Sequence, residues 1–244
     1  MKNMQVALEL YTVRDETARD FAGTLRRVAQ IGYRGVEFAG YGNLTAQEMS
    51  ALLAETGLLP VSTHLGLDAL QDSQLEASMR YCLDIGCSFI VLPWLANEWR
   101  TREGMQALAP RLNAIGQRCQ EHGITFAYHN HDFEFTRVDE VYLLDYLLQA
   151  TDASLVKIEL DVYWVAYAGL DPVSYLHTLG NRVVLLHLKD MAADRSMTEV
   201  GKGMLDMQHI CAFAQNRGLW GIVEHDHPQI PSLESAKISL EYFR

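Results

Sequence analysis

The sequence predicts an α/β fold, a single-domain (β/α)8 barrel, from three observations. Eight short apolar segments that favour strands alternate with amphipathic segments that favour helices. Most strand candidates are about 30 residues apart, which is the length of one strand–helix unit. Eight such units fit within 244 residues, the usual size of a closed barrel of this kind. We therefore expect one domain over residues 1–244.

The strand candidates can be placed in order along the chain. The first is VALELY at residues 6–11, and LVKIELD supplies another near residue 156. The other six follow a glycine that ends an amphipathic run, because glycine readily adopts the left-handed conformation that caps helices. These glycines are Gly32, Gly57, Gly86, Gly123, Gly180 and Gly218, and the strands after them start near residues 35, 59, 89, 125, 183 and 221.

The helices and loops fit the same reading. Asp171 and Pro172 form a helix start, with an N-cap residue followed by proline at the first helical position. Residues 189–206 form the longest segment without a regular pattern, and in a barrel they would be a loop or lid over the active face. An open, doubly wound sheet is the alternative, but no GxGxxG or GxxxxGK[ST] motif follows the first strand.

Composition limits the classes of function. The chain is 49% hydrophobic, enough for a substantial core, yet no apolar run reaches the roughly 18–20 residues of a membrane span. The first residues lack a signal-peptide pattern and the four cysteines lack metal-site spacing, so we expect a cytoplasmic protein with reduced thiols in helix-like segments. A net charge of −11 disfavours nucleic-acid binding.

Ionisable side chains stand at or near the end of seven of the eight strand candidates. In a closed barrel the carboxyl ends of the strands meet at one face, where active sites lie. Because side chains alternate along a strand, Glu159 and Asp161 share a face. His129 and His131 also do so if their strand continues that far. The seven sets are Glu9, Glu37, His64, His129 with His131, Glu159 with Asp161, His187, and Glu224; the fourth strand instead ends at Pro93 and Trp94.

So many buried ionisable groups predict a divalent cation. Burying carboxylates and imidazoles without partners costs several kcal/mol each, whereas a cation converts their mutual repulsion into coordination. Asp161, His187 and Glu224 are the best candidate ligands. Oxygen ligands with one or two imidazoles suit Mn²⁺, which we favour, as well as Mg²⁺, Co²⁺ or Zn²⁺. A hydrogen-bonded network without metal is the alternative.

Several motifs resemble one known family. YHNHDFEF, ELDVYW, HLKDM, EVGKG and IVEHD, at these intervals, are similar to the xylose isomerase-like TIM-barrel proteins. That group includes sugar phosphate isomerases and epimerases, ketose 3-epimerases, inosose dehydratases and, more distantly, endonuclease IV-type repair enzymes. The resemblance extends from LYTVRDE to the final helix. It implies the barrel fold and a divalent-metal site, and it leaves the substrate open.

The resemblance also implies roles for individual residues. The family's metal-binding Asp, His and Glu on the sixth, seventh and eighth strands match Asp161, His187 and Glu224. Its fifth-strand Glu, a ligand and one of two acid/base groups in the 3-epimerases, is replaced here by His129. That replacement puts the symmetric pair of carboxylates in doubt. It makes the chain more similar to the dehydratase-like branch, which tends to carry a histidine-rich stretch there.

The function we expect is a metal-dependent carbohydrate isomerase or epimerase. It would remove a proton next to a sugar or cyclitol carbonyl, with a metal-stabilised enediolate as the intermediate. His131 is the candidate base, Glu224 could both ligate and relay protons, and His129 takes the fifth-strand position. Candidate substrate-binding residues are Glu9, Glu37, His64, Trp94, Trp164 and Lys189, with Trp99, Phe133, Tyr163 and Lys202 as further possibilities.

Each assignment has an alternative. Lys189 could instead pair with Asp190 or another nearby carboxylate, and the aromatic residues could simply pack in the core. A dehydratase of the inosose dehydratase type is the alternative reaction. A phosphodiesterase of the endonuclease IV type and a non-catalytic sugar-binding barrel are less favoured. The expected partner is a small sugar or cyclitol, with no nucleic acid or membrane, and a homodimer is possible.

Overall fold

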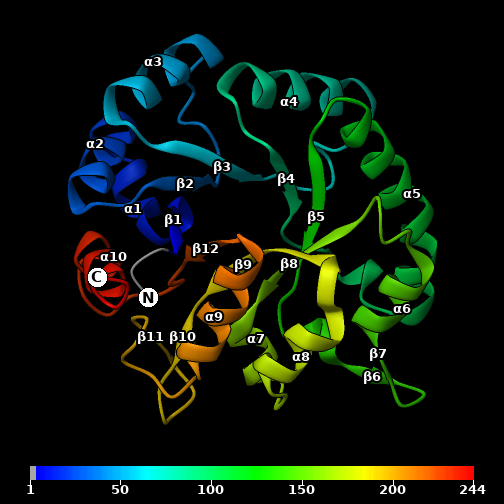
Figure 1. Ribbon diagram of the computed structural model, residues 1–244. Coiled ribbons are helices and arrows are strands. Elements are labelled where there is room, and N and C mark those ends of the chain that lie inside the picture. The colour runs from blue at the N-terminus through cyan, green and yellow to red at the C-terminus, as the bar shows by residue number, and fades with distance from the viewer. Residues whose placement is uncertain (1–3) are drawn as a thin grey trace.

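A closed barrel of eight parallel strands surrounded by helices makes up the structure, a computed structural model that describes residues 4–244 (Figure 1). Residues 1–3, part of the segment without a signal-peptide pattern, lie outside the described residues. The first strand pairs with the last and closes the ring in the order β1-β12-β9-β8-β5-β4-β3-β2. The barrel strands are β1 (Gln5–Glu9), β2 (Gly35–Phe38), β3 (Leu59–His64), β4 (Phe89–Leu92), β5 (Thr125–His129), β8 (Lys157–Asp161), β9 (Val183–Leu188) and β12 (Trp220–Val223).

The predicted barrel is confirmed. Every strand starts within one residue of its predicted position. The six glycines expected to end helices all have positive φ, between 52° and 111°. Asp171 also caps its helix as expected, since its side chain accepts the Ser174 N–H at 2.9 Å and Pro172 occupies the first helical turn.

Helices cover the outside of the barrel (Figure 1). In the described part of the chain, no helix is long and apolar enough to cross a membrane. The helices are α1 (Arg14–Thr17), α2 (Phe21–Ile31), α3 (Ala46–Thr56), α4 (Asp72–Ile85), α5 (Arg102–Glu121), α6 (Leu143–Ala150), α7 (Val162–Tyr167), α8 (Pro172–Leu179), α9 (Met207–Arg217) and α10 (Ser232–Glu241). Short hairpins β6 (Arg137–Val138) with β7 (Val141–Tyr142), and β10 (Asp190–Met191) with β11 (Met197–Thr198), project from the barrel.

Two apolar cores hold this arrangement together. The larger lies between the strands and the helices, where residues such as Leu25 and Val28 of α2 are fully buried. Burying an aliphatic side chain of this size stabilises the fold by about 2 kcal/mol. The smaller core fills the barrel interior below the polar strand ends. Its members are Ala7, Val61, Val91, Ala127, Leu185 and Ile222.

The segment expected to lack regular structure, residues 189–206, contains the short hairpin of β10 and β11, followed by a loop that one carboxylate holds. Asp190 is buried, and its side chain accepts the backbone N–H groups of Gly201, Gly203 and Leu205 at 2.9–3.2 Å. The sequence pattern missed this structure because its two strands have only two residues each, and a side chain far along the chain supplies the hydrogen bonds.

The four cysteines are free and buried, as expected. Three lie in helices, whereas Cys87 lies between the end of α4 and the start of β4, contrary to its expected place in a helix-like segment.

Candidate metal centre and active site

Polar side chains at the carboxyl ends of the strands continue the inward faces that carry the inner core. Side chains alternate along a strand, so a residue two positions beyond an inward apolar residue also faces the barrel axis. In this way one local pattern places an ionisable group above an apolar one on four strands. The pairs are Ala7 with Glu9, Ala127 with His129, Leu185 with His187, and Ile222 with Glu224.

The strand register brings these groups side by side around the ring. Residues that are 26–30 positions apart in the sequence become direct neighbours on adjacent parallel strands. The paired positions are Glu9 with Glu37, His129 with Glu159, and Asp161 with His187.

A cavity of about 640 Å³ opens above this layer, at the carboxyl ends of the strands. Most of the residues expected at the site line it. Expected residues in the lining are Glu9, His64, Trp94, His129, His131, Lys189 and Glu224; Tyr11, Ala39, Pro93, Asp226 and His227 complete it.

Some expected residues lie beside or below the cavity. Asp161 and His187 are fully buried beneath it. Glu37 is also fully buried and contacts His187 Nε2 at 2.6 Å, so it supports the site from below and does not line the substrate space. Trp164 packs 5.6 Å from the His131 ring, outside the lining.

His129, Asp161, His187 and Glu224 form one group of possible metal ligands, which we call the upper group. One ligand atom from each lies within 4.8 Å of the others. His129 Nε2 is 3.9 Å from Asp161 Oδ2, and His187 Nδ1 is 2.7 Å from Glu224 Oε2. The four residues expected as ligands are therefore neighbours in space.

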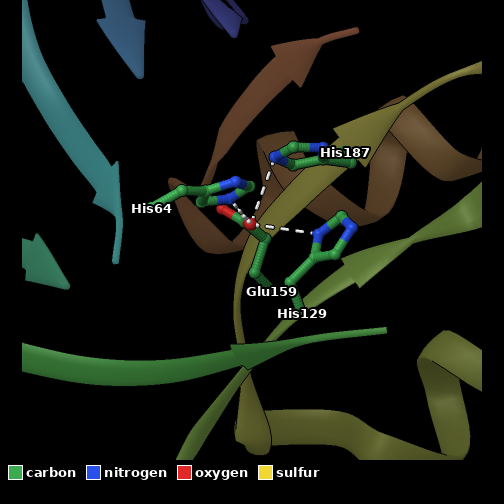
Figure 2. A group of neighbouring side chains, drawn as sticks. All are labelled: His64, His129, Glu159 and His187. Carbon is green, nitrogen blue, oxygen red and sulfur yellow. Dashed lines mark hydrogen bonds and ion pairs between the residues drawn. The ribbon is translucent and has the colours of Figure 1, made fainter. Parts of the chain in front are cut away.

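A second group lies deeper in the barrel and shares two of these histidines (Figure 2). In this floor cluster, Glu159 Oε2 is the common partner of three imidazoles. The distances from Glu159 Oε2 are 2.8 Å to His64 Nε2, 3.2 Å to His129 Nδ1 and 3.1 Å to His187 Nε2.

The local structure around Asp161 explains its orientation. Asp161 is the N-cap of α7, and its Oδ1 accepts the N–H groups of Tyr163 at 2.9 Å and Trp164 at 3.2 Å. This capping leaves Oδ2 free to face Lys189 and His129. The buried Asn130 side chain accepts the Asp161 N–H at 3.0 Å and donates to its carbonyl at 3.3 Å, which fixes β5 to β8.

Lys189 is a buried ammonium group among three carboxylates. Its Nζ lies 3.1 Å from Asp161 Oδ2, 2.7 Å from Glu224 Oε2 and 2.9 Å from Asp226 Oδ1. Burial acts to lower the pKa of Lys189, but the three negative charges prevail and raise it well above its usual range. Asp190, one of the two expected kinds of partner, instead binds backbone N–H groups.

The pKa values of the histidines shift in opposite directions because their neighbours differ. Burial acts to lower the pKa of His187, but Glu159, Glu37 and Glu224 raise it well above the usual value. Burial and the neighbouring His187 lower the pKa of His129 well below that value.

His131, the expected base, lies just beyond β5. The strand ends at His129, so the two residues are not on one continued strand face, although their rings are 5.0 Å apart. Burial and the Lys189 ammonium lower the pKa of His131 to about 3. Its backbone N–H donates to Glu134 Oε2 at 2.8 Å, which fixes the turn.

Comparison with known proteins places the chain in a family. A family model described as "Xylose isomerase-like TIM barrel" matches residues 25–244. The chain belongs to the xylose isomerase-like TIM-barrel family. The resemblance found in the sequence motifs is thereby confirmed.

Individual proteins are similar to this chain in sequence or in fold. The inosose dehydratase of Geobacillus kaustophilus is 27% identical over 192 residues, which cover 70% of this chain and 62% of that protein. A sugar phosphate isomerase/epimerase from Parabacteroides distasonis has the same fold, with a TM-score of 0.85 at 24% identity, covering 98% of this chain and 93% of that one. A zinc-bound structure of the IolI protein has a TM-score of 0.73 at 12% identity and covers 98% and 97% of the two chains.

Sequence reasoning missed two residues of the site. Asp226 lines the cavity and pairs with Lys189, and it continues the alternation of Ile222 and Glu224 along β12. That spacing of two could have identified it. Asn130 had no comparable signal, because its role depends on the adjacent strand β8.

Proposed function

We propose that the protein is a divalent-metal-dependent carbohydrate isomerase or epimerase that removes a proton next to a sugar or cyclitol carbonyl. The observation that carries this proposal is the upper group at the base of a 640 Å³ cavity. A cavity of this size accommodates a sugar-sized ligand. Membership of the family supports the same conclusion.

The residues present fit a divalent ion. Asp161 Oδ2 is buried, its cationic neighbour is Lys189 Nζ at 3.1 Å, and the upper group combines two imidazoles with two carboxylates. This donor set suits Mn²⁺, which we favour, and also Co²⁺ or Zn²⁺. A bound ion supplies Lewis-acid stabilisation of the negative charge that develops on a substrate oxygen.

His131 is the proposed base. It lines the cavity, and its ring lies 5.0 Å from that of the proposed ligand His129, so it is close to a substrate bound at the ion. The hydrogen bond from its backbone N–H to Glu134 fixes the position of the turn. Glu224, itself one of the four proposed ligands, also lines the cavity and relays protons. His129 acts as a ligand in place of the family's carboxylate.

The other lining residues orient the substrate. The Lys189 ammonium can donate a hydrogen bond to a substrate oxygen, and Glu9 and His64 offer further polar contacts from the cavity wall. Trp94, half exposed at the rim, gives a flat apolar surface for the C–H face of a sugar. Glu37 and Trp164 do not line the cavity and act on the site indirectly. Glu37 contacts His187 Nε2 at 2.6 Å, and the Trp164 ring packs 5.6 Å from the His131 ring.

Exchange of substrate hydrogen with deuterium from solvent tests the proposal. With Mn²⁺ present, the protein should introduce deuterium at a carbon next to the carbonyl of a ketose or inosose, detected by NMR. His131→Ala should reduce exchange by about 100-fold or more while metal content is unchanged. His177→Ala, which alters an exposed histidine on α8, is the matched control. If no carbonyl sugar exchanges, or if His131→Ala removes the metal instead, the assignment is wrong.

Dehydration of an inosose is the second candidate reaction. It begins with the same proton abstraction and continues with loss of a β-hydroxyl group. The similarity to the Geobacillus inosose dehydratase and the histidine at position 129 favour it. The chain covers only 62% of that protein, so inosose dehydration by this chain is a proposal. Appearance of an unsaturated product from an inosose, and absence of a deuterated epimer, would select this reaction.

The charge of the cavity lining disfavours the phosphodiesterase alternative. Lys189 is the only Lys or Arg among the described residues that line the cavity, whereas a phosphodiesterase needs a cationic track for nucleic acid. Cytoplasmic location and a homodimer remain predictions from the sequence.

A further inference from the structure

The floor cluster of His64, His129, Glu159 and His187 has the composition of a metal site in its own right. The four residues come from β3, β5, β8 and β9, and all four point toward one position inside the barrel (Figure 2). One ligand atom from each lies within 4.8 Å of the others.

Two buried carboxylates beside this position each have one oxygen atom without a hydrogen-bond partner among the described residues. Glu159 is fully buried, and its Oε1 has no hydrogen-bond partner among the described residues. The same is true of Oε1 of Glu37, whose Oε2 is 3.3 Å from His64 Nε2. A buried carboxylate oxygen without a donor is costly, and a cation at this position would lie beside both carboxylates.

The donor set and the distances suit Zn²⁺. Three imidazole nitrogens and one carboxylate oxygen are common zinc ligands, with metal–ligand distances of about 2.0–2.2 Å. In a tetrahedral site this places neighbouring ligand atoms about 3.4 Å apart. Glu159 Oε2 is 2.8–3.2 Å from the three nitrogens, which is within a few tenths of an ångström of this separation, and all four ligand atoms lie within 4.8 Å of one another.

The floor cluster and the upper group use opposite nitrogens of the same two histidines. His129 presents Nδ1 to Glu159 and Nε2 to Asp161. His187 presents Nε2 to Glu159 and Nδ1 to Glu224. A neutral imidazole has one nitrogen with a free lone pair, and its other nitrogen carries a proton. Each histidine can therefore serve one position at a time.

We propose that the floor cluster is a second metal position, selective for Zn²⁺, which excludes an ion from the upper group by taking His129 and His187. The nitrogen-rich floor favours Zn²⁺, whereas the upper group offers two carboxylates and favours Mn²⁺. The inhibitory consequence rests on the proposed function: Zn²⁺ in the floor cluster would remove two ligands from the catalytic position.

Two single variants separate the positions, because His64 is in the floor cluster but not in the upper group, and Asp161 is in the upper group but not in the floor cluster. His64→Ala removes a ligand from the floor cluster, and Asp161→Asn removes one from the upper group and keeps a side chain that can cap α7. The measurements are Zn²⁺ and Mn²⁺ affinity by competition with a chelator, metal-to-protein ratio, and circular dichroism. We expect His64→Ala to weaken Zn²⁺ binding by at least about 100-fold and Mn²⁺ binding by less than threefold. Asp161→Asn should weaken Mn²⁺ binding by at least about 100-fold and Zn²⁺ binding by less than threefold. His177→Ala should change neither affinity.

Other outcomes overturn the proposal. If His64→Ala leaves Zn²⁺ affinity unchanged, the floor cluster is a hydrogen-bonded network only. Two Zn²⁺ ions bound per chain would overturn mutual exclusion. If Asp161→Asn leaves Mn²⁺ affinity unchanged while His64→Ala weakens Zn²⁺ binding, the proposed catalytic position fails and the floor position stands.

The wild-type protein provides an independent measurement that does not depend on the folding of a variant. Co²⁺ replacing Zn²⁺ in the tetrahedral floor position should give strong visible absorption, which added Mn²⁺ reduces only at high concentration. Weak absorption, as expected for five or six ligands, would contradict the tetrahedral assignment.

Discussion

Glu134 is predicted to make the stability of the protein depend on pH. It is fully buried between Tyr128, whose hydroxyl donates to Oε1 at 2.6 Å, and the His131 N–H, which donates to Oε2 at 2.8 Å. Burial raises the pKa of Glu134 from the usual 4.5 to about 7, and these hydrogen bonds and Arg100 only partly oppose the rise.

The raised pKa gives the sign and the size of the effect. Between pH 4.5 and 7 the unfolded chain loses this proton while the folded protein keeps it, so the free energy of unfolding falls as pH rises. The stabilisation is fully present below pH 4.5 and is lost as pH rises through 7. Each pKa unit corresponds to about 1.4 kcal/mol, which makes the whole effect about 3 kcal/mol.

Glu134→Gln isolates this contribution. The amide can donate to the Tyr128 hydroxyl and accept from the His131 N–H, so both contacts persist without a titrating group. Urea unfolding at pH 5 and pH 8 should show the variant gaining about 2–3 kcal/mol relative to wild type over that interval. Glu98→Gln, at an exposed glutamate, should show no such change. Parallel pH profiles for wild type and Glu134→Gln would refute the reasoning.

Two further perturbations test the fold. In Gly116→Ala the new Cβ would lie 2.3 Å from the Leu155 carbonyl oxygen, so the free energy of unfolding should fall by about 1–3 kcal/mol. Gly66→Ala, which meets nothing within 4 Å, should change it by less than about 1 kcal/mol; equal losses would contradict the packing argument. Asp190→Ala should lower stability by about 1–3 kcal/mol and speed amide hydrogen exchange in residues 201–205. Unchanged hydrogen exchange in residues 201–205 would show that other contacts hold this loop.

Parts of the site could be predicted because they follow from local patterns. The position of Glu9, His129, His187 and Glu224 at or near the ends of predicted strands indicated that they meet at one face of the barrel. Asp161 was placed by the same rule. Lys189 was identified as a site residue, but its three carboxylate partners come from β8 and the loop after β12, so the choice among possible partners was open.

The sequence by itself determined the barrel. Eight strand starts and six helix-ending glycines depend on residues within a few positions of one another. They can therefore be recognised in the sequence without knowledge of contacts between distant residues. Closure was predicted from the number and length of the units, because eight strand–helix units in about 250 residues are typical of a closed barrel and no nucleotide-binding motif of an open sheet follows the first strand.

Only the tertiary structure decided which ionisable groups meet. Glu37 and His187 are 150 positions apart, and His64 and Glu159 are 95 apart, yet each pair is in hydrogen-bond contact. Such contacts depend on strand register and on the bulges that shift it, near Glu37 and near Glu159. A shift of one residue turns a side chain to the opposite face of its strand, so the assignment of ligands to the upper group or the floor cluster is a property of the closed barrel.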